Sequence, residues 1–182
     1  MEHLTIETPR LLIRALQITD LEAFHVYRSN PDVAKYQNFH PMSLEDCEAF
    51  IRRNLNKLYG QPGQWVQYAI ENKAARNMIG DCAIHLHAPD PRIAEIGITI
   101  SHLEQRKGYA KEALLGILSF LFDQKDIHRV VETADAENIA SINMLKSVGF
   151  RQEGYFIENI FFKGKWGSEV QFAMLKREWE EG

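Results

Sequence analysis

The sequence is poor in cysteine and lacks the segments that mark secreted or membrane proteins. Only Cys47 and Cys82 occur among 182 residues, and neither belongs to a Cys-x-x-Cys pair. The chain has no signal-peptide pattern, so we expect a reducing, cytoplasmic location rather than a disulfide framework. No apolar run approaches the ~20 residues that cross a bilayer, so we expect no membrane partner.

Strong charge of either sign is also absent. The formal net charge is −4. General nucleic-acid binders rely on basic patches that neutralise phosphates, so we expect no nucleic-acid partner. Hydrophobic residues make up 45% and charged residues 25%, as in ordinary globular proteins. The length predicts one domain, residues 1–182, that buries its own core.

Two nucleotide-binding motifs and a complete metal motif are missing. The sequence has no Gly-x-x-x-x-Gly-Lys-Ser/Thr run, and a predicted strand separates Gly97 from Gly108, which excludes Gly-x-Gly-x-x-Gly. His85 and His87 fall on one face of another predicted strand. Two histidines make only half of a usual zinc set, and no Cys-x-x-Cys pair completes it. We therefore expect no metal ion.

Local signals predict most of the helices and strands. Thr19-x-x-Glu22 and Ser43-x-x-Asp46 are typical of capping boxes, for helices that extend to Tyr27 and over 47–58. Alternating or apolar runs predict strands over 10–14, 65–70, 78–87, 94–100 and 129–134, and a hairpin over 155–175. Short connections join the strands over 65–100, which predicts an antiparallel meander.

The stretch from 94 to 121 predicts a strand that runs into an anion-binding helix start. Apolar residues alternate from Ala94 to Ile100, and the helical stripe that follows is Ala110, Ala113, Leu114, Ile117 and Leu121. Gly108 stands at the helix start, where free N–H groups and a partial positive charge suit a phosphate. The alternative is a solvated basic helix start that carries a glycine for steric convenience.

Gln105-x-x-Gly108-x-Ala110 resembles the Arg/Gln-x-x-Gly-x-Gly/Ala pyrophosphate loop of the GNAT superfamily of N-acetyltransferases, which binds acetyl-CoA. The resemblance covers nearly the whole chain, and its order and spacing are more specific than any single motif. Four further motifs resemble those of one branch of the superfamily, the ribosomal-protein N-terminal acetyltransferases. These motifs are Thr8-Pro-Arg-Leu-Leu-Ile-Arg14, Glu95-Ile-Gly97, Glu137-Asn138-x-x-Ser141 with Gly149-Phe150, and Lys163-Gly-Lys-Trp166.

The resemblance implies an α/β fold with a mixed, mostly antiparallel, splayed sheet and helices on both faces. It implies that the pantetheine arm of acetyl-CoA lies along Ile98, Thr99 and Ile100. The loop residues that it assigns to the cofactor are Gln105, Arg106, Lys107, Gly108, Tyr109, Ala110 and Lys111. Asn138, Ser141 and Asn143 are assigned to its other side, although a helix N-cap would by itself explain Asn138.

Acetyl transfer to an amine in a ternary complex needs a base, an oxyanion donor and a proton for the leaving thiolate. Glu95 is the predicted base and Glu158 the reserve, with a solvated or salt-bridged carboxylate as the alternative for each. Backbone N–H groups of Ile98–Ile100 are the predicted oxyanion donors. Ser141 is the predicted proton donor, because Leu145 stands where many superfamily members carry a tyrosine. A serine that only hydrogen-bonds the cofactor is its alternative.

The acceptor stays open between a protein N-terminal amine and a small amine such as a polyamine, amino acid or aminoglycoside. A third interpretation is a non-catalytic acyl-CoA-binding regulatory module. It is motivated by Leu145 and by Phe172, which stands where the branch commonly has tyrosine, while Ser168 replaces its common aspartate.

Two aromatic groups also have alternative interpretations. Tyr36, Phe39 and His40 belong to the implied acceptor wall, where they would contact substrate or, as we expect, cover the core. The aromatic hairpin from Phe161 to Trp166 either buries itself in the domain or forms a homodimer interface.

Overall fold

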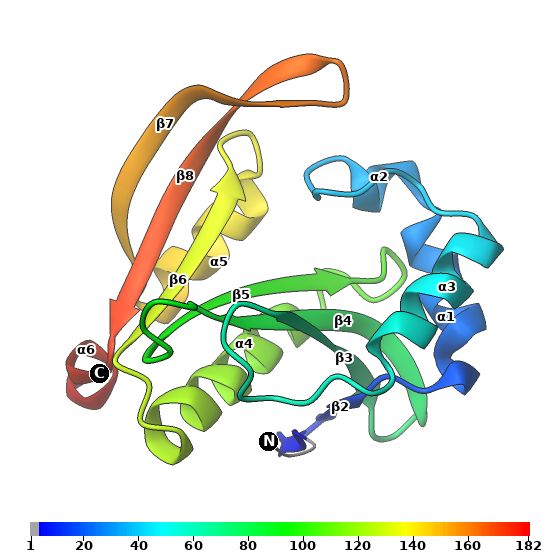
Figure 1. Cartoon of the computed structure of the whole chain (residues 1–182), viewed down its shortest axis with the longest axis horizontal. Coiled ribbons are helices and arrows are strands. Elements are labelled where there is room, and N and C mark those ends of the chain that lie inside the picture. Colours follow the sequence, from blue (N-terminus) through cyan, green and yellow to red (C-terminus); the bar gives the residue numbers. More distant parts are fainter. Residues whose placement is uncertain (1–3) are drawn as a thin grey trace.

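Figure 1 shows a computed structural model that describes residues 4–182, so the first three residues of the predicted domain lie outside it. One sheet of eight strands has the order β1-β2-β3-β4-β5-β6-β8-β7. The strands are β1 (Ile6–Glu7), β2 (Leu11–Ala15), β3 (Trp65–Asn72), β4 (Asn77–Leu86), β5 (Ile93–Ile100), β6 (Arg129–Asp135), β7 (Arg151–Phe162) and β8 (Lys165–Leu175). The helices are α1 (Leu21–Arg28), α2 (Pro31–Ala34), α3 (Leu44–Asn54), α4 (Tyr109–Ser119), α5 (Ile139–Val148) and α6 (Lys176–Glu181), with a 3-10 turn η1 (Ile18–Asp20) and a π-helix η2 (Phe120–Gln124).

The sheet is mixed and mostly antiparallel, as expected. β3, β4 and β5 form the predicted meander, and β7 and β8 form the predicted hairpin. The only parallel neighbours in the described sheet are β5 and β6. The short strand β1 was not predicted, because two residues carry too little alternation to be recognised.

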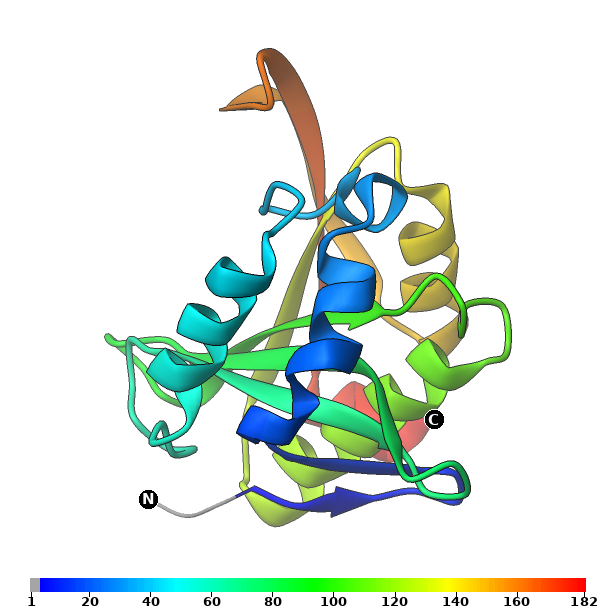
Figure 2. The same ribbon diagram turned by 90° about the vertical axis from the view of Figure 1, so that its right-hand side faces the viewer.

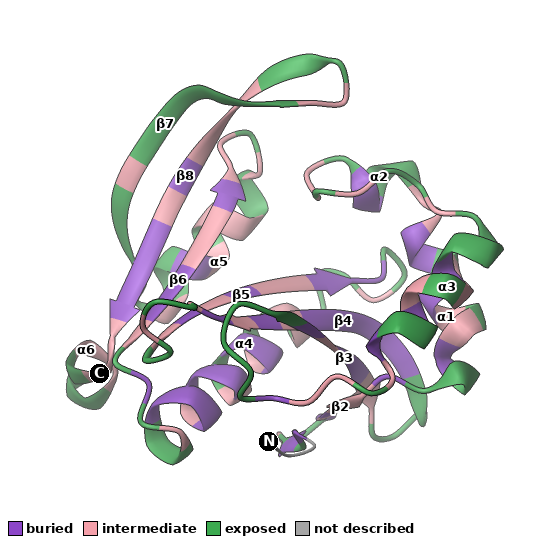
Figure 3. Ribbon diagram, viewed as in Figure 1, coloured by how far each residue is buried: buried purple, intermediate pink, exposed green. Residues whose placement is uncertain are grey.

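Helices cover both faces of the sheet, which confirms the expected fold class (Figures 1 and 2). Side chains alternate between the faces along a strand. In β3, Tyr68 and Ile70 pack in the larger core with α4, whereas Ala69 packs in a smaller core with α1 and α3. Figure 3 shows that burial is concentrated in the central strands and that β7 is largely exposed.

One of the two predicted capping boxes is present and the other is wrong. The Ser43 hydroxyl accepts from the Asp46 N–H at 3.1 Å, and α3 begins at Leu44. The box at Thr19 and Glu22 does not form. Instead, Asp20 accepts from the Gln17 N–H at 2.8 Å and precedes α1.

Arg14 explains this correction. Its guanidinium donates to Asp20 at 2.9 and 2.8 Å and to Glu71 at 2.7 Å. This arginine on β2 therefore fixes Asp20 at the helix entrance, a tertiary contact that the local signal at Thr19 could not reveal.

Both cysteines are free and buried, in agreement with the expected absence of a disulfide framework. Within residues 4–182, no helix combines the length and apolar character needed to span a membrane.

A buried polar network joins α1 to the sheet beside the site described below. Asp81 on β4 accepts from the Tyr27 hydroxyl at 2.6 Å and from Arg28 at 2.5 and 3.2 Å, and Gln67 on β3 also donates to it. Asp81 is only 1% exposed, and the Arg28 guanidinium also lies 4.1 Å from the centre of the Phe39 ring. This network holds α1 against the sheet.

Asp81→Ala should lower the free energy of unfolding by about 3–5 kcal/mol, because it leaves Arg28 as an uncompensated buried charge. Urea denaturation measures this change. Glu48→Ala is the matched control, since it removes the exposed Arg52–Glu48 pair of α3 and should cost less than about 0.5 kcal/mol. Equal losses in the two variants would contradict the assigned role of Asp81.

Candidate functional site

The sheet parts between β5 and β6. These strands pair at three positions, of which Glu95–Val131 is the last. Beyond it, β5 stays paired with β4 as far as Ile100 and β6 stays paired with β8 as far as Asp135. No further β5–β6 pair occurs in the described chain, and Figure 1 shows the two strands diverging. The predicted central splay is therefore present.

The outer edge of β5 borders this opening. Thr99 and Ile100 are buried and Ile98 is half-buried. A strand edge without a neighbour has main-chain N–H and C=O groups that an extended, amide-bearing molecule can pair with. The three residues predicted to line the pantetheine arm therefore lie together on one unpaired edge.

The segment 101–108 joins β5 to α4 through two left-handed residues. Arg106 has φ 63° and Gly108 has φ 82°, a conformation that favours glycine. Gly108 is exposed and is the N-cap of α4. Tyr109 and Ala110 open the helix, and the first N–H groups of a helix have no intrahelical partner. The helix start thus has the form that the sequence predicted.

The polar side chains of this loop are partly engaged within the chain. Gln105 donates to Ile100 O at 3.1 Å, Lys107 pairs with Glu104 at 2.9 Å, and Lys111 donates to Ser147 O at 3.2 Å. The side chain of Gln105 therefore fixes the end of β5, and Lys111 joins α4 to α5. The main-chain amides at the helix start remain for a ligand, and the exposed side chains of Arg106 and Lys107 place positive charge on the same loop.

Arg10 braces the same loop, a role that the sequence did not reveal. Its guanidinium donates to Lys107 O at 3.1 Å and to Glu112 at 2.5 Å, and it lies 4.5 Å from the centre of the Tyr109 ring. Thr8 donates to Glu112 at 2.7 Å. The Thr8-Pro-Arg10 motif was noticed only as part of a resemblance, and its contacts lie about 100 residues away along the chain.

The start of α5 lies on the other side of the opening. Asn138 accepts from the Ser141 N–H at 3.2 Å, so it is the predicted N-cap, and Gly149 ends the helix with φ 103°. Ser141 is half-buried and Asn143 is exposed. Leu145 is fully buried in the core, so its side chain is unavailable for chemistry in any case.

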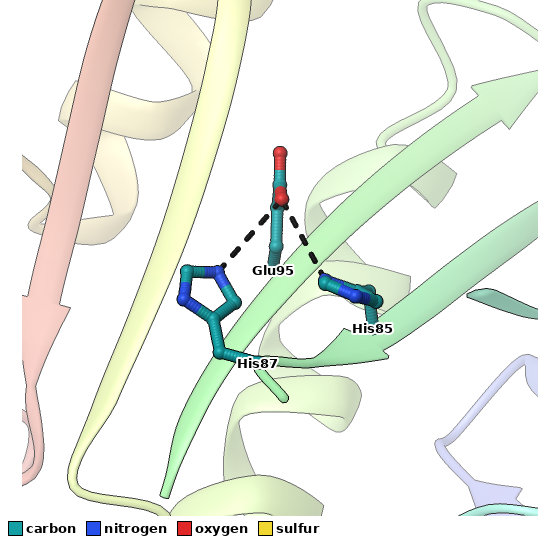
Figure 4. A group of neighbouring side chains, drawn as sticks. All are labelled: His85, His87 and Glu95. Carbon is teal, nitrogen blue, oxygen red and sulfur yellow. Dashed lines mark ion pairs between the residues drawn. The ribbon is translucent and has the colours of Figure 1, made fainter. Parts of the chain in front are cut away.

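Glu95 lies at the last β5–β6 pair, between two histidines. Its Oε2 atom is 3.9 Å from His85 Nδ1 and 3.9 Å from His87 Nε2. Figure 4 shows the carboxylate between the two imidazole rings. The Trp65 ring stacks on His85 with centroids 5.1 Å apart. The two histidines predicted to share a strand face are therefore brought against the predicted base, a contact between strands that spacing could not show.

A second carboxyl group, Glu132, lies one residue beyond the last pair on β6. Its Oε2 atom is buried and has no hydrogen-bond partner among the described residues. Burial raises the pKa of Glu132 well above its usual value, and the charge of Glu95 adds to the effect. The opening thus has one half-exposed carboxylate, Glu95, and one carboxyl group that favours its protonated form.

Comparison with known proteins identifies this arrangement. Residues 10–151 match the family model described as an acetyltransferase (GNAT) domain. A relative from Bacillus subtilis, the uncharacterized N-acetyltransferase YnaD, is 32% identical over 174 residues, which cover 96% of this chain and 98% of that protein. The chain belongs to the GNAT family. It is an N-acetyltransferase, of the acyltransferase class EC 2.3.1, and its family uses acetyl-CoA.

Other GNAT relatives differ in the acceptor that their names give. The spermidine N(1)-acetyltransferase of Vibrio cholerae is 23% identical, over 92% of this chain and 94% of its own length. The ribosomal protein uS5-alanine N-acetyltransferase of Escherichia coli is 29% identical over 48% of this chain and 45% of its own. A crystal structure of a GNAT-family acetyltransferase from Bacillus anthracis superposes with a TM-score of 0.87, at 29% identity, over 96% of this chain and 99% of that one.

In this GNAT chain, the β7–β8 hairpin places Glu158 away from Glu95. Glu158 has φ 46°, and its N–H donates to the Ser168 hydroxyl at 2.9 Å. It lines a cavity of about 280 Å³ between the hairpin and residues 135–137, which Glu95 does not line. Phe172 is fully buried in the core. Ser168 lines the same cavity as Glu158, and its main-chain oxygen accepts from the Ala136 N–H at 2.9 Å.

The tip of the hairpin reaches the segment after α2. Lys163 donates to the main-chain oxygens of Ala34 and Gln37, the second at 2.8 Å. The His40 ring packs on Phe162 with centroids 5.2 Å apart, while Phe39 covers Arg28. Phe39 is half-buried against the smaller core, as expected. His40 is exposed and lines a cavity of about 530 Å³ beside Lys163, so it does not cover the core. Tyr36 is half-buried beneath Lys35.

Phe161 and Trp166 form an edge-to-face pair, yet each stays about 60% exposed, so this part of the hairpin does not bury itself in the domain.

Proposed function

We propose that this chain transfers the acetyl group of acetyl-CoA to a primary amine, in a ternary complex held in the parting between β5 and β6. The observation that carries the proposal is the parting itself, which combines an unpaired strand edge with a glycine-led helix start. An extended pantetheine arm matches the first feature and a diphosphate matches the second.

In this arrangement the arm pairs with Ile98, Thr99 and Ile100. Amides of the segment from Gln105 to Lys111 bind the diphosphate, with Arg106 and Lys107 adding positive charge. Asn138, Ser141 and Asn143 contact the cofactor from α5. The support is geometric, because these groups border the two sides of one opening.

The chemistry follows from the groups near the opening. The amine nitrogen attacks the thioester carbonyl carbon, and Glu95 takes its proton directly or through water. N–H groups of β5 stabilise the oxyanion, the carbon–sulfur bond breaks, and Ser141 gives a proton to the thiolate. Glu95 suits the role of base because it is half-exposed at the end of the ladder, whereas burial favours the protonated form of Glu132, which is a far weaker base than a carboxylate.

The acceptor is either a small amine or a peptide N-terminus. The named relatives act on spermidine and on a ribosomal protein, and the spermidine enzyme matches over the larger share of this chain. The bridge from Lys163 to Ala34 and Gln37 spans the hairpin and the α2 segment, which favours a small acceptor over a bulky one. We further propose one cytoplasmic domain and a homodimer through the exposed hairpin face.

A panel of polyamines, amino acids, aminoglycosides and N-terminal peptides, each with acetyl-CoA, tests the function. We expect an acetylated product, detected by mass, with at least one small amine. Binding of acetyl-CoA without product on any acceptor would instead support a non-catalytic regulatory module.

Glu95→Gln should lower kcat by about a hundredfold or more at neutral pH, because the amide cannot accept the proton, while affinity for acetyl-CoA stays unchanged. Steady-state kinetics with the acceptor found in the panel measures both. Glu158→Gln is the matched control and should keep turnover near that of the wild type. The opposite pattern would transfer the role of base to Glu158.

A further inference from the structure

His85, His87 and Glu95 form a cluster that acetyl transfer does not fully explain. His85 and Glu95 are direct partners across the β4–β5 ladder, and His87 is two residues further along the same side. The two imidazole rings have centroids 5.5 Å apart, and Glu95 Oε2 lies between their near nitrogen atoms (Figure 4). Two strands thus bring three potential ligands to one point.

The geometry approaches that of a three-ligand zinc site. The three ligand atoms all lie within 4.8 Å of one another, and each histidine nitrogen is 3.9 Å from the carboxylate oxygen. Zinc bonds of about 2.0–2.2 Å in a tetrahedron separate neighbouring ligands by about 3.4 Å. Small side-chain rotations therefore suffice to close the site. Two imidazoles and one carboxylate are also ligand types that zinc prefers.

A second observation points to a ligand. His85 Nδ1 is buried and has no hydrogen-bond partner among the described residues. An unpaired buried polar atom is costly, so this nitrogen is suited to bind something that the chain does not supply. Stacking on Trp65, with 21° between the ring planes, fixes the orientation of the His85 ring.

The cluster is also accessible. The side chains of His87 and Glu95 are 36% and 32% exposed, whereas His85 is 19% exposed. An ion can therefore enter from solvent, past His87 and Glu95, and reach the more buried nitrogen. The sequence argued against a metal because two histidines are too few, and the third ligand comes from the neighbouring strand.

We propose that His85 Nδ1, His87 Nε2 and Glu95 Oε2 bind a divalent cation of the zinc class, with a fourth coordination position open to solvent. Occupation of this site engages the Glu95 carboxylate, so the cation inhibits acetyl transfer reversibly. The binding part stands apart from the proposed function, because it requires neither acetyl-CoA nor turnover.

Metal binding is tested first, without acetyl-CoA and with any histidine tag removed. Titration with Co²⁺, followed by its visible absorption, and competition of Zn²⁺ with a chromophoric chelator should reveal one site with a dissociation constant of about 10 µM or below. His87→Ala and Glu95→Gln should each weaken Zn²⁺ binding by about a hundredfold.

His25→Ala is the matched control, since it removes a histidine of α1 rather than of the β4–β5 ladder, and it should bind Zn²⁺ as the wild type does. Circular dichroism establishes that each variant is folded. Absence of a single saturable site in the wild type, or unchanged affinity in His87→Ala, would overturn the site.

Inhibition is tested with the acetylated amine as the readout, because free coenzyme A binds zinc through its thiol. Zinc should inhibit the wild type, a chelator should restore its rate, and His87→Ala should keep its own zinc-free rate at the same concentration. Full wild-type activity at saturating zinc would overturn the link to Glu95. A failed binding test would leave the amine panel unaffected, so the two proposals fail separately.

Discussion

The hydrogen-bonded ladder between β5 and β6 is the constraint on which the structure of the site depends. This ladder ends at Glu95 and Val131. Beyond that point β5 stays hydrogen-bonded to β4, and β6 stays hydrogen-bonded to β8. The sheet can therefore part in its centre without losing either half. The parting leaves main-chain groups of β5 without a strand partner, and buried groups of that kind need one from elsewhere.

The same parting separates two carboxyl groups into different environments. Glu95 is half-exposed between two histidines, whereas Glu132 has a buried oxygen without a partner among the described residues and a raised pKa. Neighbouring carboxyl groups with different environments can take different protonation states and hence different roles. We infer that Glu95 exchanges protons or binds a cation, while burial of Glu132 beside it favours its neutral form.

The sequence predicted what depends on local signals. Gly108, the Ser43 capping box and the Asn138 N-cap were recognised because a left-handed φ or a helix cap restricts residue type within one turn. Prediction failed where distant residues compete. Arg14 binds Asp20, so Asp20 rather than Thr19 lies at the start of α1. Arg10 donates to the main chain of a loop about 100 residues away.

In the candidate site, too, local motifs were predictable and contacts between distant residues were not. The resemblance to the family pointed to Glu95 and to the loop from Gln105 to Lys111. The contact of Glu95 with His85 and His87 depends on the β4–β5 register, which no local pattern fixes. The π-helix η2 and the burial of Asp81 were also unpredicted, since both follow from packing against other elements.

The central claim is that main-chain amides at the start of α4 bind the diphosphate of coenzyme A. Calorimetric titration of coenzyme A into the wild type, Gly108→Val and Gly164→Val tests it most directly. The two glycines have φ 82° and 77°, so the two variants share the backbone strain, but only Gly108 lies at the helix start. We expect Gly164→Val to bind coenzyme A as the wild type does and Gly108→Val to bind it at least about a hundredfold more weakly, because a side chain would fill the approach to the amides. Equal affinity in all three proteins would contradict the claim.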